Sequence, residues 1–80
     1  MTPEQIREMI KSGLPDSTAT VMSDDNTHFD ATVISAAFAG KRPLQRHQMI
    51  YATLGSTMGT EIHALSIQAL TPEESAGRSG

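Results

Sequence analysis

Hydrophobic residues near the amino terminus recur at the spacing of one helix face. They fall three or four positions apart, at Ile6, Met9, Ile10 and Leu14, and this period predicts an amphipathic helix. Thr2 is placed to cap the first turn, and Pro3 suits the first helical position because its missing N–H would be unpaired there. Gly13 and Pro15 end the pattern after about three turns.

The next two segments have the pattern of strands. Residues 17–23 are rich in Thr and Val, and residues 24–27 are turn formers. Residues 28–35 alternate, with Phe29, Ala31 and Val33 on one face and polar residues on the other. A β-branched run, a polar turn and an alternating run predict a hairpin with one solvated face.

A longer helix and a third strand follow. Gly40 permits a turn, Pro43 opens the second predicted helix and Gly59 is placed to end it. The expected apolar stripe comprises Leu44, His47, Tyr51, Leu54 and Met58, with Ile50 at its flank. Residues 61–70 alternate again, and one face carries His63, Leu65, Ile67 and Ala69. A Thr-Pro-Glu-Glu segment at 71–74 predicts the start of a last helix.

The predicted order is helix, strand, strand, helix, strand, helix. A helix that connects two strands of one sheet makes those strands parallel, so we expect an α+β fold in which helices pack on a three-stranded mixed sheet. Eighty residues support a single core, and we assign the domain to residues 1–74. The small, polar residues 75–80 predict a flexible tail.

The composition narrows the possible functions. The chain has no cysteine, which excludes a disulfide framework, a thiol nucleophile and a complete iron–sulfur site built by this chain alone. It also lacks a glycine-rich phosphate loop, a serine elbow and an HExxH motif, so we do not expect an enzyme. No long apolar run and no signal-peptide pattern is visible, which favours a cytoplasmic protein without a membrane role.

Charge is distributed unevenly along the chain. Residues 31–60 contain no acidic residue and carry Lys41, Arg42 and Arg46, whereas the segments on both sides are net acidic. The simplest interpretation is a solvated helix start. The alternative is a small basic patch, with His47 adjacent, that attracts an anionic partner or nucleic acid.

The three histidines are the remaining candidates for metal chemistry. His47 lies on the predicted apolar stripe, where a partly buried core histidine is the simplest interpretation. His28 and His63 each stand where a strand meets a loop, and a three-stranded sheet is able to bring them near each other. Two histidines can hold one iron of a 2Fe–2S cluster, but the other iron then needs thiolates from another molecule.

Several short blocks follow one another between Thr27 and Glu74: Thr27-His28-Phe29, Val33-Ile34-Ser35, Phe38-Ala39-Gly40-Lys41, Leu44-Gln45-Arg46-His47, Ile50-Tyr51, Ile62-His63-Ala64-Leu65-Ser66 and Thr71-Pro72-Glu73-Glu74. In these blocks and their order, the sequence resembles the BolA family. The short amino-terminal helix and the loop resemble its IbaG-type branch as much as BolA itself. The resemblance implies a fold similar to class II KH domains.

The resemblance also implies a role and a partner. BolA-like proteins pair with monothiol glutaredoxins, so we expect a monomer that forms a heterodimer and handles iron–sulfur clusters. The glutaredoxin cysteine and glutathione would supply thiolates to a shared 2Fe–2S cluster, and the isolated chain would bind none. His63 matches the family's carboxyl-terminal histidine ligand. His28 lies in the loop where family members place a second ligand, which is either His or Cys. The alternative function is DNA-binding regulation through the helix-turn-helix-like segment at residues 40–48, with Lys41, Arg42, Arg46 and His47 facing DNA or a partner.

Overall fold

The computed structural model describes residues 1–78, which form helices and strands in the order expected from the sequence. The α-helices are α1 (Pro3–Gly13), α2 (Pro43–Leu54) and α3 (Pro72–Arg78). The strands are β1 (Thr18–Met22), β2 (His28–Ile34) and β3 (Ala64–Leu70), and two 3-10 turns, η1 (Ala36–Phe38) and η2 (Gly55–Thr57), flank α2. The predicted α+β class is confirmed.

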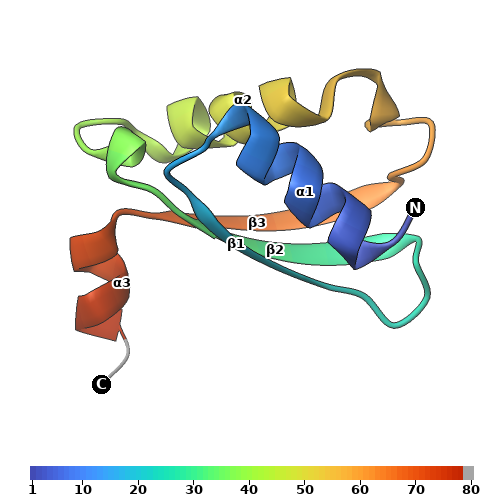
Figure 1. The fold of residues 1–80 in the computed structure, drawn as a ribbon, viewed down its shortest axis with the longest axis horizontal. Coiled ribbons are helices and arrows are strands. Elements are labelled where there is room, and N and C mark those ends of the chain that lie inside the picture. Colours follow the sequence, from blue (N-terminus) through green and yellow to red (C-terminus); the bar gives the residue numbers. More distant parts are fainter. Residues whose placement is uncertain (79–80) are drawn as a thin grey trace.

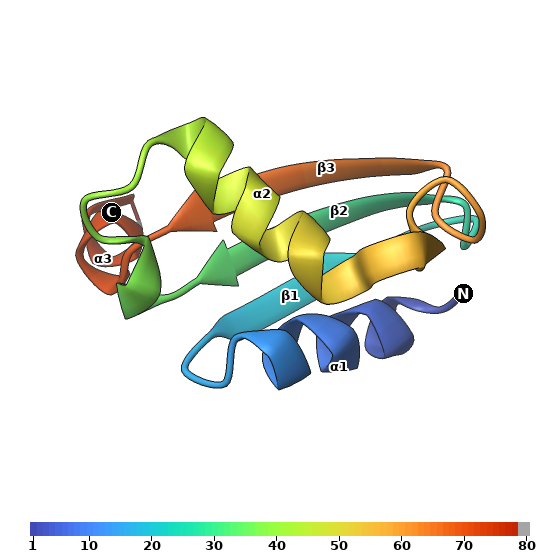
Figure 2. The same ribbon diagram turned by 90° about the horizontal axis from the view of Figure 1, so that it is seen from above.

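The three strands form one mixed sheet in the order β1, β2, β3. β1 and β2 pair antiparallel, and β2 and β3 pair parallel because the chain crosses over through α2 between them. Helices α1 and α2 cover the same face of the sheet, whereas α3 lies beyond the carboxyl end of β3 (Figure 1). Seen from above, α2 runs across the sheet and α1 lies alongside β1 (Figure 2). The opposite face of the sheet is open to solvent at His28 and Asp30.

The core lies between the two helices and the covered face of the sheet. Its buried residues come from every layer: Ile6, Ile10, Phe29, Ala31, Val33, Phe38, Ile50, Leu54 and Ile62. The predicted inward positions of the first helix and of β2 are therefore confirmed. Thr2 accepts a hydrogen bond from the Gln5 backbone N–H, and the Gln5 side chain accepts one from Thr2, so a capping box begins α1.

The expected apolar stripe of the second helix is wrong in its direction and its length. Ile50 and Leu54 are buried, but Leu44 is 68% exposed and Tyr51 is 39% exposed. The face toward α1 and the sheet is thus centred on Ile50, because the crossing of α1 fixes how α2 is rotated. The helix ends at Leu54, since Gly55 takes a positive φ of 55° that favours glycine.

The last helix extends farther than the sequence indicates. Thr71 accepts a hydrogen bond from the Glu74 N–H, and the Glu74 carboxylate accepts one from the Thr71 N–H. This capping box starts α3, which continues to Arg78, so residues 75–78 are helical where we expected the tail to begin. The rest of that segment, residues 79 and 80, lies outside the described residues. Within the described chain, no helix has the length and apolar character needed to cross a membrane.

The crossing of α1 and α2 predicts the effect of one substitution. A Cβ at Gly13 would meet Thr53 Cγ2 at 2.5 Å and Thr53 Cβ at 2.9 Å. Helix propensity favours alanine over glycine by up to about 1 kcal/mol, but overpacking of this kind costs about 1–3 kcal/mol. We expect Gly13→Ala to lower the free energy of unfolding, measured by urea denaturation.

Two further variants separate the effect of helix propensity from that of the steric contact. A Cβ at Gly77 in α3 meets nothing within 4 Å, so Gly77→Ala should be neutral or slightly stabilising. Adding Thr53→Ser to Gly13→Ala removes the closest methyl group, keeps the Cβ at 2.9 Å and keeps the hydroxyl that donates to the Ile50 carbonyl, so the double variant should recover part of the lost stability. An equal loss in the single and double variants would contradict the steric explanation.

Candidate functional site

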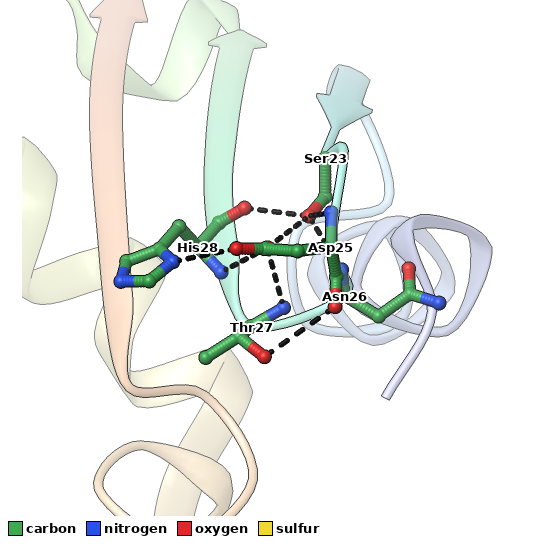
Figure 3. A network of polar contacts seen from close by, with 5 residues as sticks. All are labelled: Ser23, Asp25, Asn26, Thr27 and His28. Carbon is green, nitrogen blue, oxygen red and sulfur yellow. Dashed lines mark hydrogen bonds and ion pairs between the residues drawn. The ribbon is translucent and has the colours of Figure 1, made fainter.

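The loop between β1 and β2 holds His28 in a network of hydrogen bonds (Figure 3). The Asp25 Oδ1 atom accepts from the backbone N–H groups of Thr27 and His28, both at 2.9 Å. The Ser23 hydroxyl donates to the His28 carbonyl at 2.6 Å, and Asn26 turns the chain with a φ of 56°. The first residue of β2 is thus fixed by short-range polar contacts.

The imidazole of His28 is part of the same network. Its Nδ1 atom lies 2.8 Å from Asp25 Oδ2, although 70% of the His28 side chain is exposed. The His28 backbone N–H, its ring and the Thr27 N–H together hold the pKa of Asp25 far below its ordinary value. Asp25 therefore remains ionised throughout the neutral range.

His63 stands just before β3, in a bend that begins the strand later than expected. Glu61 and Ile62 donate their backbone N–H groups to the Thr57 carbonyl, and this turn replaces the first residues of the predicted strand. Ile62 is buried in the core, whereas His63 is exposed. The turn therefore anchors the chain at Ile62 and leaves the next side chain at the surface.

The parallel pairing brings the two candidate histidines to one edge of the fold. In the register of β2 and β3, His28 is opposite Ala64, the residue directly after His63. Adjacent strands lie about 4.8 Å apart, and both histidines are exposed. No cluster of three or more His, Asp, Glu or Cys side chains suited to a metal ion occurs in the described part of the chain.

The basic segment at the start of α2 contains two exposed cations and one that has partners inside the fold. Lys41 and Arg42 are exposed, and the Arg42 N–H donates to the Gln45 side chain at the start of α2. His47 is half-buried on the same helix. The exposed part of the predicted patch is therefore Lys41 and Arg42, with His47 at its border.

Arg46 is held inside the fold. Its side chain is 12% exposed and forms a bidentate ion pair with Glu74, with Nη1 at 2.6 Å from Oε1 and Nη2 at 3.3 Å from Oε2. Nη1 also donates to the Ala69 carbonyl and Nε to the Lys41 carbonyl, and the guanidinium lies 6.0 Å from the centre of the Phe38 ring. Arg46 thus ties α2 to β3, α3 and the preceding loop.

Asp25 and Glu74 make side-chain contacts that were not predicted from the sequence. From the sequence, residues 24–27 are predicted turn formers and Glu74 is part of a predicted helix start. The Asp25–His28 spacing of three residues is the signal for the carboxylate–imidazole contact, and the Thr71–Glu74 spacing is that of a capping box. Nothing in the local sequence indicates the pairing of Glu74 with Arg46, because 28 positions separate the two residues.

Comparison with known proteins identifies the family. The model of the BolA family, described as "BolA-like protein", matches residues 7–74. This chain belongs to the BolA family. A solved BolA homologue from Coxiella burnetii has 40% sequence identity and a TM-score of 0.81, and the match covers 95% of this chain and 97% of that one. The BolA domain of SufE1 from Arabidopsis thaliana has 35% identity and a TM-score of 0.78, with 90% and 93% of the two chains covered.

Relatives of this BolA-family chain differ in length and in name. An uncharacterized protein of the rpoN-murA intergenic region of Acinetobacter guillouiae is 40% identical over 92% of this chain and 89% of its own length. Human BolA-like protein 1 is 48% identical over 60% of this chain, which spans 35% of that protein. A Vibrio cholerae protein named DNA-binding transcriptional regulator BolA is 44% identical over 60% of this chain and 45% of its own length.

The Arg46–Glu74 pair predicts a change of stability with pH. Hydrogen bonds from the Arg46 guanidinium, and then from the Thr71 N–H, lower the pKa of Glu74 from 4.5 to about 2. A carboxylate with a lowered pKa in the folded state stabilises the fold fully above its unfolded pKa, and the contribution is lost as the pH falls through the folded pKa. We expect Glu74→Gln to flatten the decrease in melting temperature between pH 4.5 and about 2.

Glu73 supplies the matched control for this titration. It is the neighbouring acid on α3, is exposed, and its side chain makes no hydrogen bond or ion pair within the described residues. Glu73→Gln should therefore retain the pH dependence of the unsubstituted protein. Identical melting curves for the two variants across this pH range would show that the Arg46 pair does not stabilise the fold.

Proposed function

We propose that this chain is an adaptor, not an enzyme, which binds a monothiol glutaredoxin and completes a shared 2Fe–2S cluster. His63 is the principal ligand from this chain and His28 is the second. The partner's active-site cysteine and glutathione supply the thiolates. The observation that carries the proposal is the strand register, in which His28 is opposite the residue that follows His63.

The residues of this chain fit half of such a cluster. Imidazole is an accepted ligand for one iron of a 2Fe–2S centre when thiolates hold the other. Both histidines are exposed at adjacent strand ends, so a partner has access to them, and the chain has no cysteine of its own. These features support a cluster held between two proteins, with the isolated chain lacking it.

The exposed cations support association with an acidic partner surface. Lys41 and Arg42 are exposed in a segment of residues 31–60 that contains no acidic side chain. Opposite charges on two partners raise their association rate more than their final affinity. In this proposal, the two cations guide the encounter with the glutaredoxin, and the histidines take part after it.

The ligand assignment is tested in the complex. We expect coexpression with a monothiol glutaredoxin and anaerobic purification to yield a coloured heterodimer. His63→Ala should change its visible absorption and circular dichroism spectra and shorten cluster retention by at least about tenfold, the effect that weakened ligand support has on metal sites. His28→Ala should give a smaller change in the same direction.

His47 provides the control for loss of an imidazole. It lies half-buried on α2, next to Arg46, which contacts Ala69 near the carboxyl end of β3 and not the amino end that His63 precedes, so His47→Gln should leave the cluster spectrum unchanged while the complex still forms. A spectrum unchanged by His63→Ala would remove this residue as a ligand. A heterodimer that never carries a cluster would remove the proposed function.

DNA binding is the second candidate function. It is favoured by the exposed pair Lys41 and Arg42 directly before α2 and by the name of the Vibrio cholerae relative. A cation binds a phosphate readily only when it has no ion pair within its own protein, and Arg46 is paired with Glu74. The basic segment therefore offers two cations to DNA, Lys41 and Arg42.

The size of this footprint sets the expected salt dependence. Each phosphate contact contributes about −0.9 to the slope of log affinity against log salt, so two contacts predict a slope of about −2. Gel-shift titration at several salt concentrations measures this slope, and Lys41→Ala combined with Arg42→Ala should abolish it. The absence of any shift at low salt would eliminate DNA binding.

A further inference from the structure

The carboxylate of Asp25 is oriented by groups other than the imidazole that it contacts. Its Oδ1 atom accepts from two backbone N–H groups, those of Thr27 and His28, and lies 3.3 Å from the Ser23 hydroxyl. Its other oxygen, Oδ2, is thereby turned toward His28 Nδ1 at 2.8 Å. The backbone of the loop therefore fixes the position of Oδ2, independently of the contact with the His28 ring.

An ionised carboxylate accepts hydrogen bonds and cannot donate them. The contact with Oδ2 therefore requires the His28 ring to carry a proton on Nδ1. In a neutral imidazole, the other nitrogen then has a free lone pair. Nε2 is the atom that this arrangement leaves for a metal, and metal-binding histidines are commonly oriented in this way by a carboxylate on the opposite ring nitrogen.

We propose that Asp25 is a positioning residue that holds His28 in the Nδ1–H tautomer and so presents Nε2 to the iron of the shared cluster. The role toward iron rests on the proposed function, whereas the tautomer is a property of the free protein. His28 borders a surface hollow of about 280 Å³, lined also by Met22 and Asp30, which leaves room for a group from outside. His63 has no side-chain hydrogen bond among the described residues, so it lacks a corresponding orienting group.

A purely structural role for Asp25 makes a different prediction. Aspartate and asparagine both close turns by accepting backbone hydrogen bonds, so Asp25→Asn retains an acceptor for the N–H groups of the loop. An asparagine also brings an NH₂ group, which donates. If this NH₂ group faces His28, Nδ1 must accept and the ring proton moves to Nε2. The substitution thus preserves the turn and reverses the tautomer.

The first experiment measures the tautomer in the free protein. Long-range ¹H–¹⁵N correlation spectra of the imidazoles, recorded where the rings are neutral, should assign the His28 proton to Nδ1 in the unsubstituted protein. Asp25→Asn should shift it to Nε2. Asp24→Asn removes the same charge one residue away, where no hydrogen bond to the His28 ring exists, and should leave the tautomer unchanged.

The outcomes of this experiment decide the orienting role. A His28 proton on Nε2 in the unsubstituted protein overturns it, and this measurement needs no variant to fold. A well-folded Asp25→Asn protein that keeps the Nδ1 proton also overturns it, with folding judged from the backbone amide spectrum. A reversal in Asp25→Asn, together with no change in Asp24→Asn, supports it.

The second experiment connects the tautomer to the cluster. In the anaerobic heterodimer, Asp25→Asn should shorten cluster retention relative to Asp24→Asn by a factor no larger than that of His28→Ala, because a supporting group acts only through the ligand that it orients. Equal retention in the two variants overturns the role of Asp25 toward iron and leaves the proposed function intact. A heterodimer without any cluster overturns the proposed function. It leaves the orienting role of Asp25 in the free protein unchanged, because the first experiment measures that role without a partner.

Discussion

The parallel pairing of β2 with β3 is the constraint on which the candidate site depends. Two parallel neighbours require a crossover, and α2 makes it while burying Ile50 and Leu54 against the sheet and α1. The amino ends of both strands then lie at the same edge, which places His28 opposite Ala64. A slip of the register by one residue would turn Phe29 away from the core, so the packing that buries Phe29 also fixes His28 opposite Ala64, the residue after His63.

Arg46, a residue of α2, connects that helix to the carboxyl end of β3 and to α3. Its guanidinium contacts the carboxylate of Glu74 and the carbonyls of Lys41 and Ala69. This role changes the interpretation of the basic segment, because a cation with internal partners adds little to the field felt by an anion outside. The charge near α2 that is open to a partner is thus smaller than the sequence indicates, and the segment is suited to weak guidance more than to strong phosphate binding.

Local patterns in the sequence predict elements better than they predict how those elements meet. The capping box of α1, the inward face of β2 and the crossover follow from neighbouring residues and were predictable. The rotation of α2, which exposes Leu44, depends on the approach of α1 at Gly13, where only a hydrogen atom fits beside Thr53. Candidate ligands could be named from the sequence, but their spacing across strands and the contact between Arg46 and Glu74 are tertiary features.

The two histidines of the candidate site differ in how firmly the fold holds them. His28 begins a strand whose partner strands lie on both sides, and the loop before it orients its ring through Asp25. His63 follows the buried Ile62 but lies in a bend and has no comparable contact in the described residues. A ligand that is oriented in advance loses less conformational entropy on binding, whereas an unrestrained ligand can adjust to a partner. The structure therefore holds one imidazole with a loop carboxylate and leaves the other without a side-chain contact in the described residues, and the shared cluster that we propose would use both.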